Sequence, residues 1–274
     1  MAKVLICATN FGTWGEELQA PWDIIKKAGH QVTLATWFGK KPLPLAVSVD
    51  PNFFDPIIKF HVNPPDVCQR IKELTDGDEW THPIKFKDAK MSDYDALVLT
   101  GGLGAMLDMC NNYNLHKLIL DALEQKKLVG ALCYSVATLV FCRNPKTKKS
   151  VIYGKKIAAH PAAWDFYGPD FDFTYELYGA TPDNSGAVGL HTPGFLWPLE
   201  HIVRDAVGPR GKCIADAKAT RTRPKVVFDW PFVTGTSVES SIAYGEKIVE
   251  ILAKLEKEKM KKSASKPSKK SKKK

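Results

Sequence analysis

Several patterns that assign a function directly are missing from this sequence. The six cysteines form no CxxC pair and no Cys/His cluster with zinc spacing, and the histidines are scattered, so we expect no metal site. There is no P-loop, and no GxGxxG motif follows a predicted strand, so no nucleotide cofactor is expected. No apolar run approaches the ~18 residues of a membrane span, and we expect no membrane association.

The composition is that of an ordinary globular protein. The chain has 274 residues, of which 44% are hydrophobic and 25% are charged, and this length suits one large domain or two small ones. A core of this size needs no disulfide bonds, so the cysteines are predicted to be reduced thiols in the cytoplasm, with the nucleus as a second possibility. The opening stretch MAKVLICATNFG leads directly into an apolar strand, which is not the pattern of a signal peptide.

The positive charge of the chain is confined to its C-terminus. Residues 254–274 hold 11 Lys and 2 Glu, a balance of +9 that equals the net charge of the whole protein, so residues 1–253 are neutral. A segment rich in Lys, Ser and Pro has too few apolar residues to fold, and we expect a disordered tail beyond the basic end of a terminal helix. Nuclear import and non-specific contact with nucleic acid are the alternatives, although no aromatic residue accompanies these lysines to stack on bases.

Apolar strands and amphipathic helices alternate along the chain. Each expected strand is a short apolar run rich in β-formers, and these runs lie at 3–9, 31–37, 94–100, 128–132 and 226–235. The expected helices lie at 16–30, 114–127, 135–142 and 237–259.

Some local details can be added to this pattern. Pro21 predicts a kink or a late start in the first helix. A hairpin is predicted at 149–159. In the last helix, the apolar residues expected to face the core are Ile242, Ile248, Val249, Ile251 and Leu252.

The alternation predicts an α/β fold of the flavodoxin-like type, a doubly wound and mostly parallel sheet with helices on both faces. We expect a single domain over residues 1–253, with loop-rich insertions near 39–92 and 161–225 and a short helix at 65–75 in the first of them. Ligands of such sheets bind beyond the carboxyl ends of the strands. Two predicted strands end there, one at a glycine-rich turn and the other at Cys133.

Cys133 lies between a predicted strand and a predicted helix. This is the arrangement of a nucleophile elbow, in which small residues two positions before and after, here Ala131 and Ser135, let the strand and helix approach closely. The helix dipole would lower the thiol pKa, and the N–H groups of Tyr134 and Gly102 could hold an oxyanion. A buried structural thiol is the alternative, because most cysteines are small buried hydrophobes.

Four successive segments resemble landmarks of the ThiJ/PfpI superfamily: LVLTGGLGAM, LVGALCYSVATLV, GKKIAAHP and VTGTSVESSIAYGEKIVEIL. This is the class I glutamine amidotransferase-like fold, which includes the parkinsonism-associated deglycase and a heat-inducible glyoxalase/chaperone branch. The resemblance covers roughly residues 3–38, 93–142 and 151–160 and the C-terminal strand and helix. The insertions look more like those of the larger chaperone/glyoxalase branch.

The resemblance also implies an acid beside the cysteine. In relatives, a glutamate four residues before a proline at the start of the first helix hydrogen-bonds the nucleophilic sulfur. The matching residue here is Glu17, four before Pro21, and the adjacent Glu16 is its competitor. A buried carboxyl there would have a raised pKa and could move protons.

The histidine of the family pattern is displaced in this chain. Many relatives carry it directly after the cysteine, where this sequence has Tyr134, a poor general base at neutral pH. A second subset of relatives uses a histidine from a THP-like segment, and AAHP places His160 there. His191, within the second insertion, is a weaker candidate. The departure puts peptidase or amidase chemistry in doubt.

The resemblance therefore implies a cofactor-independent enzyme that acts on small reactive aldehydes, of the glyoxalase III kind (methylglyoxal to lactate, a D-lactate dehydratase type of lyase) or the deglycase kind. Cys133, Glu17 and His160 would be catalytic, and a homodimer is expected because relatives commonly dimerise. Two alternatives stay open: a hydratase or amide hydrolase at the same turn, and a redox-sensing holdase chaperone in which Cys133 oxidises. Large aromatic residues, including Trp14, Trp164, Trp197 and Trp230, could line a pocket or fill the core.

Overall fold

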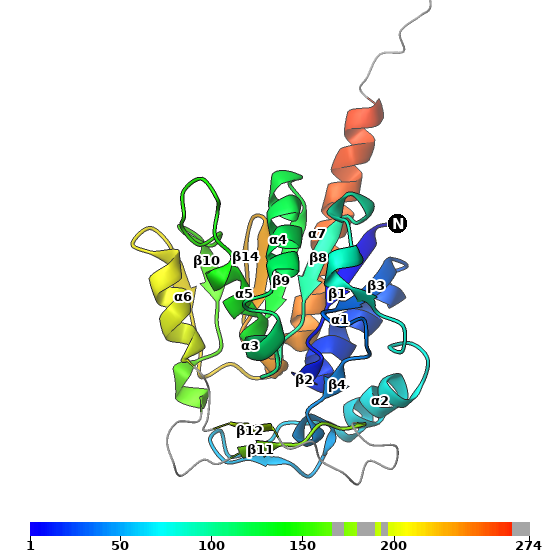
Figure 1. The fold of residues 1–274 in the computed structure, drawn as a ribbon, viewed down its shortest axis with the longest axis vertical. Coiled ribbons are helices and arrows are strands. Elements are labelled where there is room, and N and C mark those ends of the chain that lie inside the picture. Colours follow the sequence, from blue (N-terminus) through cyan, green and yellow to red (C-terminus); the bar gives the residue numbers. More distant parts are fainter. Residues whose placement is uncertain (166–172, 180–189, 193–196, 265–274) are drawn as a thin grey trace, which may run out of the picture.

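The computed structural model describes residues 1–165, 173–179, 190–192 and 197–264. Within this part of the chain, a central sheet has the strand order β14-β15-β9-β8-β1-β3-β7 (Figure 1). Neighbouring strands run parallel except β14 and β15, which form an antiparallel pair. The strands of this sheet are β1 (Lys3–Cys7), β3 (Gln31–Thr36), β7 (Ile84–Lys85), β8 (Ala96–Leu99), β9 (Leu128–Leu132), β14 (Val226–Asp229) and β15 (Phe232–Gly235).

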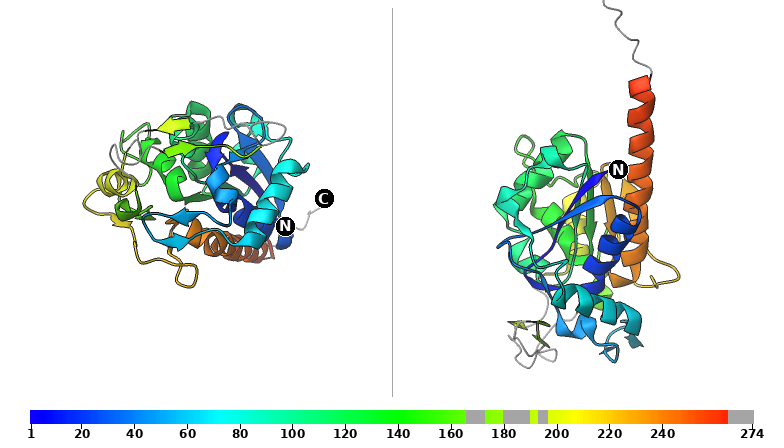
Figure 2. Two further views of the ribbon diagram at one scale, coloured as in Figure 1. Left: turned by 90° about the horizontal axis from the view of Figure 1, so that it is seen from below. Right: turned by 90° about the vertical axis from the view of Figure 1, so that its right-hand side faces the viewer.

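Helices cover both faces of the sheet, as Figure 2 shows. α1 and α7 pack together on one face, and α3, α4 and α5 lie on the other. This arrangement confirms the predicted doubly wound, mostly parallel, flavodoxin-like fold. The helices are α1 (Gly15–Lys27), α2 (Pro65–Asp76), α3 (Ala105–Asp108), α4 (Tyr113–Glu124), α5 (Val136–Phe141), α6 (Leu199–Val207) and α7 (Ser241–Ala264).

Short strands and 3-10 turns connect these elements. The short strands are β2 (Phe11–Thr13), β4 (Leu43–Pro44), β5 (Phe54–Asp55), β6 (Phe60–His61), β10 (Lys156–Ala158), β11 (Phe173–Tyr175), β12 (Leu190–Thr192) and β13 (Lys212–Ile214). The 3-10 turns are η1 (Ala46–Val49), η2 (Phe86–Asp88), η3 (Met91–Asp93), η4 (Cys133–Ser135), η5 (Ala162–Trp164) and η6 (Val238–Ser240).

Both predicted insertions contribute to a layer beyond the carboxyl ends of the strands, at the bottom of Figure 1. The first insertion supplies α2, where a short helix was predicted, and the pair β5–β6; the second supplies β11–β12. The two segments are bonded to each other, since Ala46 N–H donates to Glu176 C=O at 2.6 Å and Tyr178 Oη donates to Asp76 Oδ2 at 2.9 Å. This layer covers the edge of the sheet at which ligands bind in such folds.

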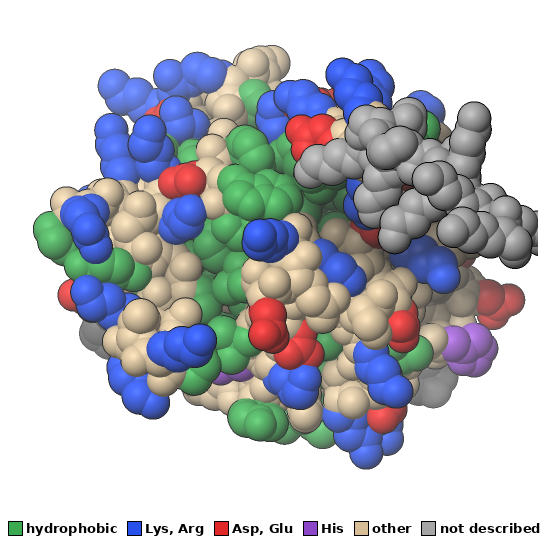
Figure 3. All heavy atoms as spheres, turned by 90° about the horizontal axis from the view of Figure 1, so that it is seen from above, with side chains coloured by type: hydrophobic (Ala, Val, Ile, Leu, Met, Phe, Trp, Pro, Cys, Tyr) green, Lys and Arg blue, Asp and Glu red, His purple; other side chains and the backbone are tan. Residues whose placement is uncertain are grey.

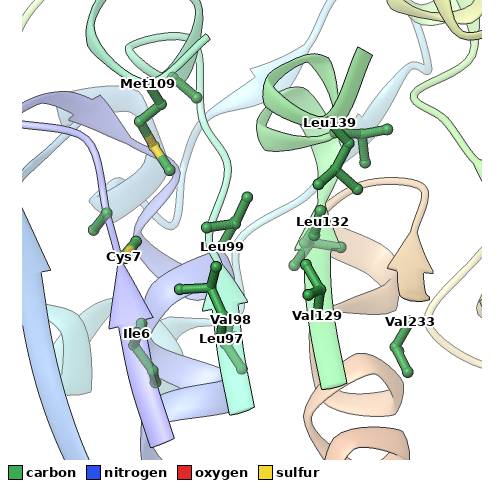
Figure 4. Packing of buried hydrophobic residues seen from close by; sticks show 14 of the residues in the cluster. Ile6, Cys7, Leu97, Val98, Leu99, Met109, Val129, Leu132, Leu139 and Val233 are labelled. Carbon is green, nitrogen blue, oxygen red and sulfur yellow. The ribbon is translucent and has the colours of Figure 1, made fainter. Parts of the chain in front are cut away.

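The core lies between the central strands and the helices on each side. Residues of β1, β8 and β9 are buried along almost their whole length, which is typical of a sheet covered on both faces. Figure 4 shows side chains of these strands, among them Ile6, Leu97 and Val129, together with Met109 and Leu139 from the segments of one covering layer. On the other face Tyr244 of α7 is fully buried, and its Oη donates a hydrogen bond to the carbonyl of Leu99 at 3.2 Å.

Three local predictions differ from the structure. α1 starts at Gly15 and continues through Pro21, so the late start is not observed. The proline removes one backbone hydrogen bond from the helix, and the packing of the helix offsets that loss. The hairpin predicted at 149–159 is wrong, because β10 pairs in parallel with β13. Ile242 is 49% exposed rather than in the core, since the buried stripe of α7 runs through Tyr244, Ile248, Ile251 and Leu252.

α7 carries the basic end of the chain away from the sheet. Lys259 Nζ forms an ion pair with Asp95 Oδ1 at 2.9 Å. Figure 3 shows that face: Lys and Arg side chains are scattered over it with Asp and Glu between them, around a strip of hydrophobic side chains. Residues 265–274, the remainder of the predicted tail, lie outside the described residues, so their disorder and nuclear import stay predictions. In the part of the chain that is described, every helix is too short or too polar to cross a membrane.

A buried carboxyl in α3 predicts an unusual pH dependence of stability. Asp108 is 2% exposed and accepts a hydrogen bond from the Asn10 N–H at 2.7 Å, and burial raises its pKa to about 7 from 3.8. Because the folded-state pKa lies above the unfolded one, this group stabilises the fold below pH 3.8, and the contribution is lost as the pH rises to about 7.

Asp108→Asn is therefore expected to unfold at higher urea concentration than the wild type at pH 8. The gain is at most ~4 kcal/mol, because one pKa unit corresponds to ~1.4 kcal/mol, and it should shrink toward pH 5. Asp88→Asn, at an exposed carboxyl, is the control and should show no such trend. A gain that is the same at pH 5 and pH 8 would contradict the raised pKa.

Candidate active site

Cys133 lies at a sharp turn between β9 and α5. Its φ angle is 54°, a left-handed conformation that costs a non-glycine residue about 1–3 kcal/mol and persists only where neighbouring structure enforces it. Ser135 helps to enforce it, since its Oγ accepts a hydrogen bond from Leu132 N–H at 3.0 Å and donates one to Leu132 C=O at 2.8 Å. Ala131 and Ser135 are fully buried, as the need for small residues at both positions predicts. The predicted strand–cysteine–helix turn is present.

The carboxyl of Glu17 lies beside this cysteine. Glu17 is in the first turn of α1, is 1% exposed and hydrogen-bonds the Cys133 thiol. The backbone of Gly101 passes so close that a Cβ there would lie 2.3 Å from Glu17 Oε2 and 2.8 Å from Cys133 Cβ, so the site requires glycine at this position. Glu16 is directed elsewhere, because its two carboxylate oxygens each lie 2.5 Å from the guanidinium of Arg221. Of the two competing glutamates, the structure brings Glu17 to the sulfur.

Burial favours the protonated forms of both Cys133 and Glu17. Burial raises the pKa of the Cys133 thiol well above its ordinary value, and the nearby Glu17 carboxyl raises it further. Burial likewise raises the pKa of Glu17, with the carboxyls of Glu239 and Glu16 adding to the effect. The expectation of a thiol pKa lowered by the helix dipole is therefore wrong. α5 has only six residues, whereas burial and an adjacent acid both disfavour negative charge on the sulfur.

A histidine and a serine also contact the sulfur. His160 Nδ1 lies 3.8 Å and Ser237 Oγ 3.7 Å from Cys133 Sγ. His160 Nε2 in turn lies 3.3 Å from Asp165 Oδ1, an oxygen that also accepts a hydrogen bond from Tyr134 Oη. All of these side chains are buried. A continuous chain of polar contacts therefore runs from the thiol through the imidazole to a carboxylate.

The imidazole of His160 is a neutral partner. Burial lowers its pKa to about 3, and a hydrogen bond with the Trp164 backbone opposes this only in part. Asp165 Oδ1 lies 3.3 Å from Nε2, and a neutral imidazole with its proton on Nε2 presents Nδ1 to the thiol as an acceptor. Burial thus favours the uncharged forms of the thiol, the carboxyl and the imidazole over a thiolate–imidazolium pair.

The two predicted oxyanion donors lie near the sulfur. The N–H of Tyr134 hydrogen-bonds the sulfur and by itself favours the thiolate form. Gly102 has a φ of 104° and lines the same cavity as Cys133. The glycine turn is anchored, because the Trp14 N–H and the Thr13 Oγ1 both donate to the Gly101 carbonyl, at 3.3 and 2.9 Å. Binding of an oxyanion by these N–H groups stays a prediction.

All five predicted site residues line one cavity of about 530 Å³; they are Cys133, Glu17, His160, Gly102 and Tyr134. The first insertion supplies lining residues between Val47 and Val62, and the second supplies Trp164 and residues 217–222. Trp14 also lines the cavity, whereas Trp197 and Trp230 are not among its lining residues. The insertions therefore form much of the wall around the sulfur.

Sequence reasoning missed three residues that line this cavity and Asp165 behind His160. Asp165, Ser237, Glu239 and Arg221 were not singled out. Ser237 follows β15, and the rule that sites form beyond the carboxyl ends of parallel strands could have found it. Asp165 lies five residues after His160, and a carboxylate close to a candidate base is a usable signal. Nothing in the local pattern of residues 217–222 points to Arg221.

Two further predictions concern His191 and metal binding. His191 lies on β12, where its backbone pairs with Thr174, but its side chain lies outside the described residues. In the described ranges no group of three or more His, Cys, Asp or Glu residues is placed to hold a metal ion.

Comparison with known proteins gives a consistent result. A model of the "ThiJ/PfpI family-like" proteins matches residues 9–158. Glyoxalase 3 of Candida albicans is 24% identical over 176 residues, which are 57% of this chain and 68% of that protein. A glutathione-independent glyoxalase of Schizosaccharomyces pombe is 26% identical over 155 residues, which are 55% of this chain and 60% of that protein. The matched part thus spans about two thirds of the first relative and less than two thirds of the second.

Solved structures match over more of the chain. Rapid Encystment Protein 24 kDa of Francisella tularensis has a TM-score of 0.67 at 18% identity, covering 91% of this chain and 98% of that one. Glyoxalase III of Candida albicans has a TM-score of 0.62 at 21% identity, covering 91% and 96%. DJ-1beta of Drosophila melanogaster has a TM-score of 0.54 at 16% identity, covering 92% and 91%. At these identities the likeness establishes a shared fold.

Proposed function

Because the chain belongs to the ThiJ/PfpI-like family, we propose that it is a glutathione-independent glyoxalase that converts small 2-oxoaldehydes such as methylglyoxal to 2-hydroxy acids. The names of its curated relatives support this class of activity. The observation that carries the proposal is the pairing of a thiol at a strained turn with a buried carboxyl in one cavity. Cys133 and Glu17 are the pair.

The first step is addition of the thiol to the aldehyde. The sulfur of Cys133 bonds to the aldehyde carbon, its proton passes to Nδ1 of His160, and the carbonyl oxygen takes the proton of Glu17 to give a hemithioacetal. While charge develops on that oxygen, the N–H groups of Gly102 and Tyr134 stabilise it. The imidazole is unprotonated and can accept a proton at Nδ1; because burial lowers its pKa to about 3, it holds that proton only briefly and returns it later in the cycle.

The second step moves a proton between the two carbons. The Glu17 carboxylate left by the first step takes the proton from the former aldehyde carbon, and an enediol(ate) forms. Returning a proton to the neighbouring carbon gives the thioester of lactate, so the first carbon is oxidised and the second reduced within one molecule. Water then cleaves the thioester: its OH bonds to the acyl carbon, its remaining proton returns to Glu17, and the departing sulfur takes back its proton from His160. This releases lactic acid and restores the thiol. No external oxidant or reductant takes part.

Production of lactate in the absence of any added thiol tests the proposal. Purified protein and methylglyoxal are incubated without glutathione, and lactate is measured by chiral chromatography. Formation of one enantiomer in excess is expected, because a cavity that holds the enediol in one orientation delivers the proton to one face. Racemic lactate at the rate of the buffer alone, from a folded protein, would overturn it.

The contact between His160 and Cys133 supports a second candidate, a thiol hydrolase acting on esters or amides. The distance of 3.8 Å from Nδ1 to Sγ and the carboxylate behind Nε2 are the features such an enzyme needs. The neutral resting state weakens it, because a hydrolase of this type benefits from a preformed thiolate. Faster Cys133-dependent cleavage of a p-nitrophenyl ester or an amide than of methylglyoxal would favour the hydrolase.

Asp165 is expected to position His160 for the first step. In Asp165→Asn the amide can donate a hydrogen bond to Nε2. This favours the tautomer whose proton is on Nδ1, so Nδ1 can no longer accept the proton of the thiol. We expect kcat to fall by about 10–10³-fold with a smaller change in KM. Tyr134→Phe is the matched control, because it removes the other hydrogen bond to Asp165 but keeps the carboxylate and the backbone N–H. Equal losses in both variants would mean that Asp165 acts only through folding.

A further inference from the structure

The cavity around Cys133 is far larger than methylglyoxal requires. Its volume of about 530 Å³ falls in the range of roughly 300–1,000 Å³ that accommodates drug-sized ligands, whereas methylglyoxal has only three carbon atoms. The additional volume lies next to the sulfur in the same cavity, so a substrate bonded to Cys133 has room for a larger substituent.

Most of the wall around this volume is apolar. The β5–β6 segment and its neighbours supply Phe53, Ile58, Phe60 and Val62, and Trp14 packs edge-to-face on Phe53 with ring centroids 6.3 Å apart. Ile58 is 36% and Phe60 62% exposed, although both line the cavity. Covering these solvent-exposed apolar side chains with the apolar surface of a ligand is energetically favourable.

Two charged groups of the wall, Arg221 and Glu239, already have partners within the protein. The guanidinium of Arg221 is held by both carboxylate oxygens of Glu16 and donates to the Val62 carbonyl at 2.7 Å. Burial raises the pKa of Glu239, whose Oε1 accepts hydrogen bonds from Thr236 and Ser240. On this side of the cavity a substrate carboxylate would therefore meet the Glu239 carboxyl and a guanidinium that is already paired with Glu16.

The carboxylate of Asp55 accepts two backbone N–H groups, and Lys218 is exposed. Neither residue therefore places a desolvated charge beside the sulfur.

We propose that the preferred substrate is a 2-oxoaldehyde whose second substituent is an uncharged apolar group of about four to eight carbons, which the aromatic wall of the first insertion binds. This inference rests on the proposed function. The aldehyde carbon is attacked as in methylglyoxal, and the apolar group extends from the ketone carbon over Phe53 and Phe60. The insertion thus selects the substrate, while the turn and α1 supply the chemistry.

Kinetics with three 2-oxoaldehydes test the inference. Methylglyoxal is the small reference, 2-oxohexanal is the apolar six-carbon substrate, and 3-deoxyglucosone is a polar substrate with the same number of carbons. We expect kcat/KM for 2-oxohexanal to exceed both others by at least about tenfold. One additional methylene bound in an apolar pocket raises kcat/KM by roughly tenfold or more. A kcat/KM for 2-oxohexanal equal to or below that of methylglyoxal would overturn the inference while leaving the glyoxalase proposal intact.

Two variants separate the wall from general effects. Phe53→Ala should reduce the preference for 2-oxohexanal over methylglyoxal, because it removes one side of the apolar wall. Phe228→Ala, which truncates a 46% exposed phenylalanine on β14 outside the cavity lining, should leave that preference unchanged. An unaltered preference in Phe53→Ala would contradict the assigned binding surface.

A binding readout keeps the inference testable even if no aldehyde is turned over. Alkylation of Cys133 by iodoacetamide is followed in the presence of 2-heptanone or of acetone, neither of which is an aldehyde. Protection at a lower concentration of 2-heptanone than of acetone is expected. Failure of turnover together with such protection would reject the glyoxalase activity but not the apolar site; equal protection by both ketones would reject the site itself.

Discussion

Replacing Cys133 with serine is expected to lower kcat/KM for methylglyoxal by about 10³-fold or more. A hydroxyl is a much weaker nucleophile than a thiol and would need a strong base to activate it. His160 contacts this position, and burial makes it a weak base by lowering its pKa to about 3. Because a hydroxyl is a much weaker acid than a thiol, proton transfer from serine to this imidazole is harder than from the thiol. The measurement is initial lactate formation at saturating and at low methylglyoxal concentration.

The matched control for this variant is Cys213→Ser. The Sγ of Cys213 donates to the Glu200 carbonyl at 3.6 Å, an interaction that a serine can retain, and Cys213 does not line the cavity. Activity close to that of the wild type is expected. Retention of most activity in a folded Cys133→Ser protein would show that the thiol is not the nucleophile, whatever Cys213→Ser does.

Glu17→Gln is expected to separate thiol reactivity from turnover. Glutamine cannot transfer protons, so kcat should fall by about 10²–10⁴-fold, the usual contribution of a general acid–base. The thiol of Cys133 should nevertheless become more reactive, because its pKa should fall. Glu17 raises that pKa through its charge and its hydrogen bond; the variant removes the charge, and its amide N–H can donate to a thiolate. Alkylation of Cys133 by iodoacetamide should therefore begin at a lower pH than in the wild type.

Glu239→Gln is the comparison for this experiment. Glu239 also lines the cavity, and burial raises the pKa of its carboxyl too. Its carboxyl, however, accepts hydrogen bonds from Thr236 and Ser240 rather than from the sulfur. We expect a much smaller loss of turnover than in Glu17→Gln. A wild-type pH profile of alkylation in Glu17→Gln would contradict the direct contact of the two side chains, and equal losses of turnover would contradict a special role for Glu17.

The sequence predicted the fold and the turn at Cys133 for identifiable reasons. Fully apolar runs such as LVGAL mark strands buried on both faces, and the small residues around Cys133 constrain the backbone locally. Ile242 and the hairpin at 149–159 were predicted wrongly, because each depended on which neighbouring segment a short element packs against. The single domain over 1–253 and the expected homodimer stay predictions.

The electrostatics of the site could not be predicted in the same way. The direction of the Cys133 pKa shift depends on burial and on the distance to Glu17, more than a hundred residues away in the chain. The sequence pattern contained only the helix dipole, which favours the thiolate, and burial outweighs it. Asp165 and Arg221 come from the second insertion, where irregular segments carry no periodicity that places one residue relative to another.

The most direct test of the thiol–carboxyl mechanism is observation of the hemithioacetal itself. Glu17→Gln should still allow thiol addition, because water can supply the proton that Glu17 gives to the carbonyl oxygen. It should block the following abstraction of the proton from carbon, so the adduct should accumulate. Methylglyoxal labelled with ¹³C at the aldehyde carbon is added to this variant and followed by ¹³C NMR, with Cys133→Ser/Glu17→Gln as the reference for adducts on lysine and arginine. A protein-bound sp³ carbon resonance that requires Cys133 is the predicted result; identical spectra of the two proteins, alongside lactate formation by the wild type, would show that the reaction does not pass through the sulfur.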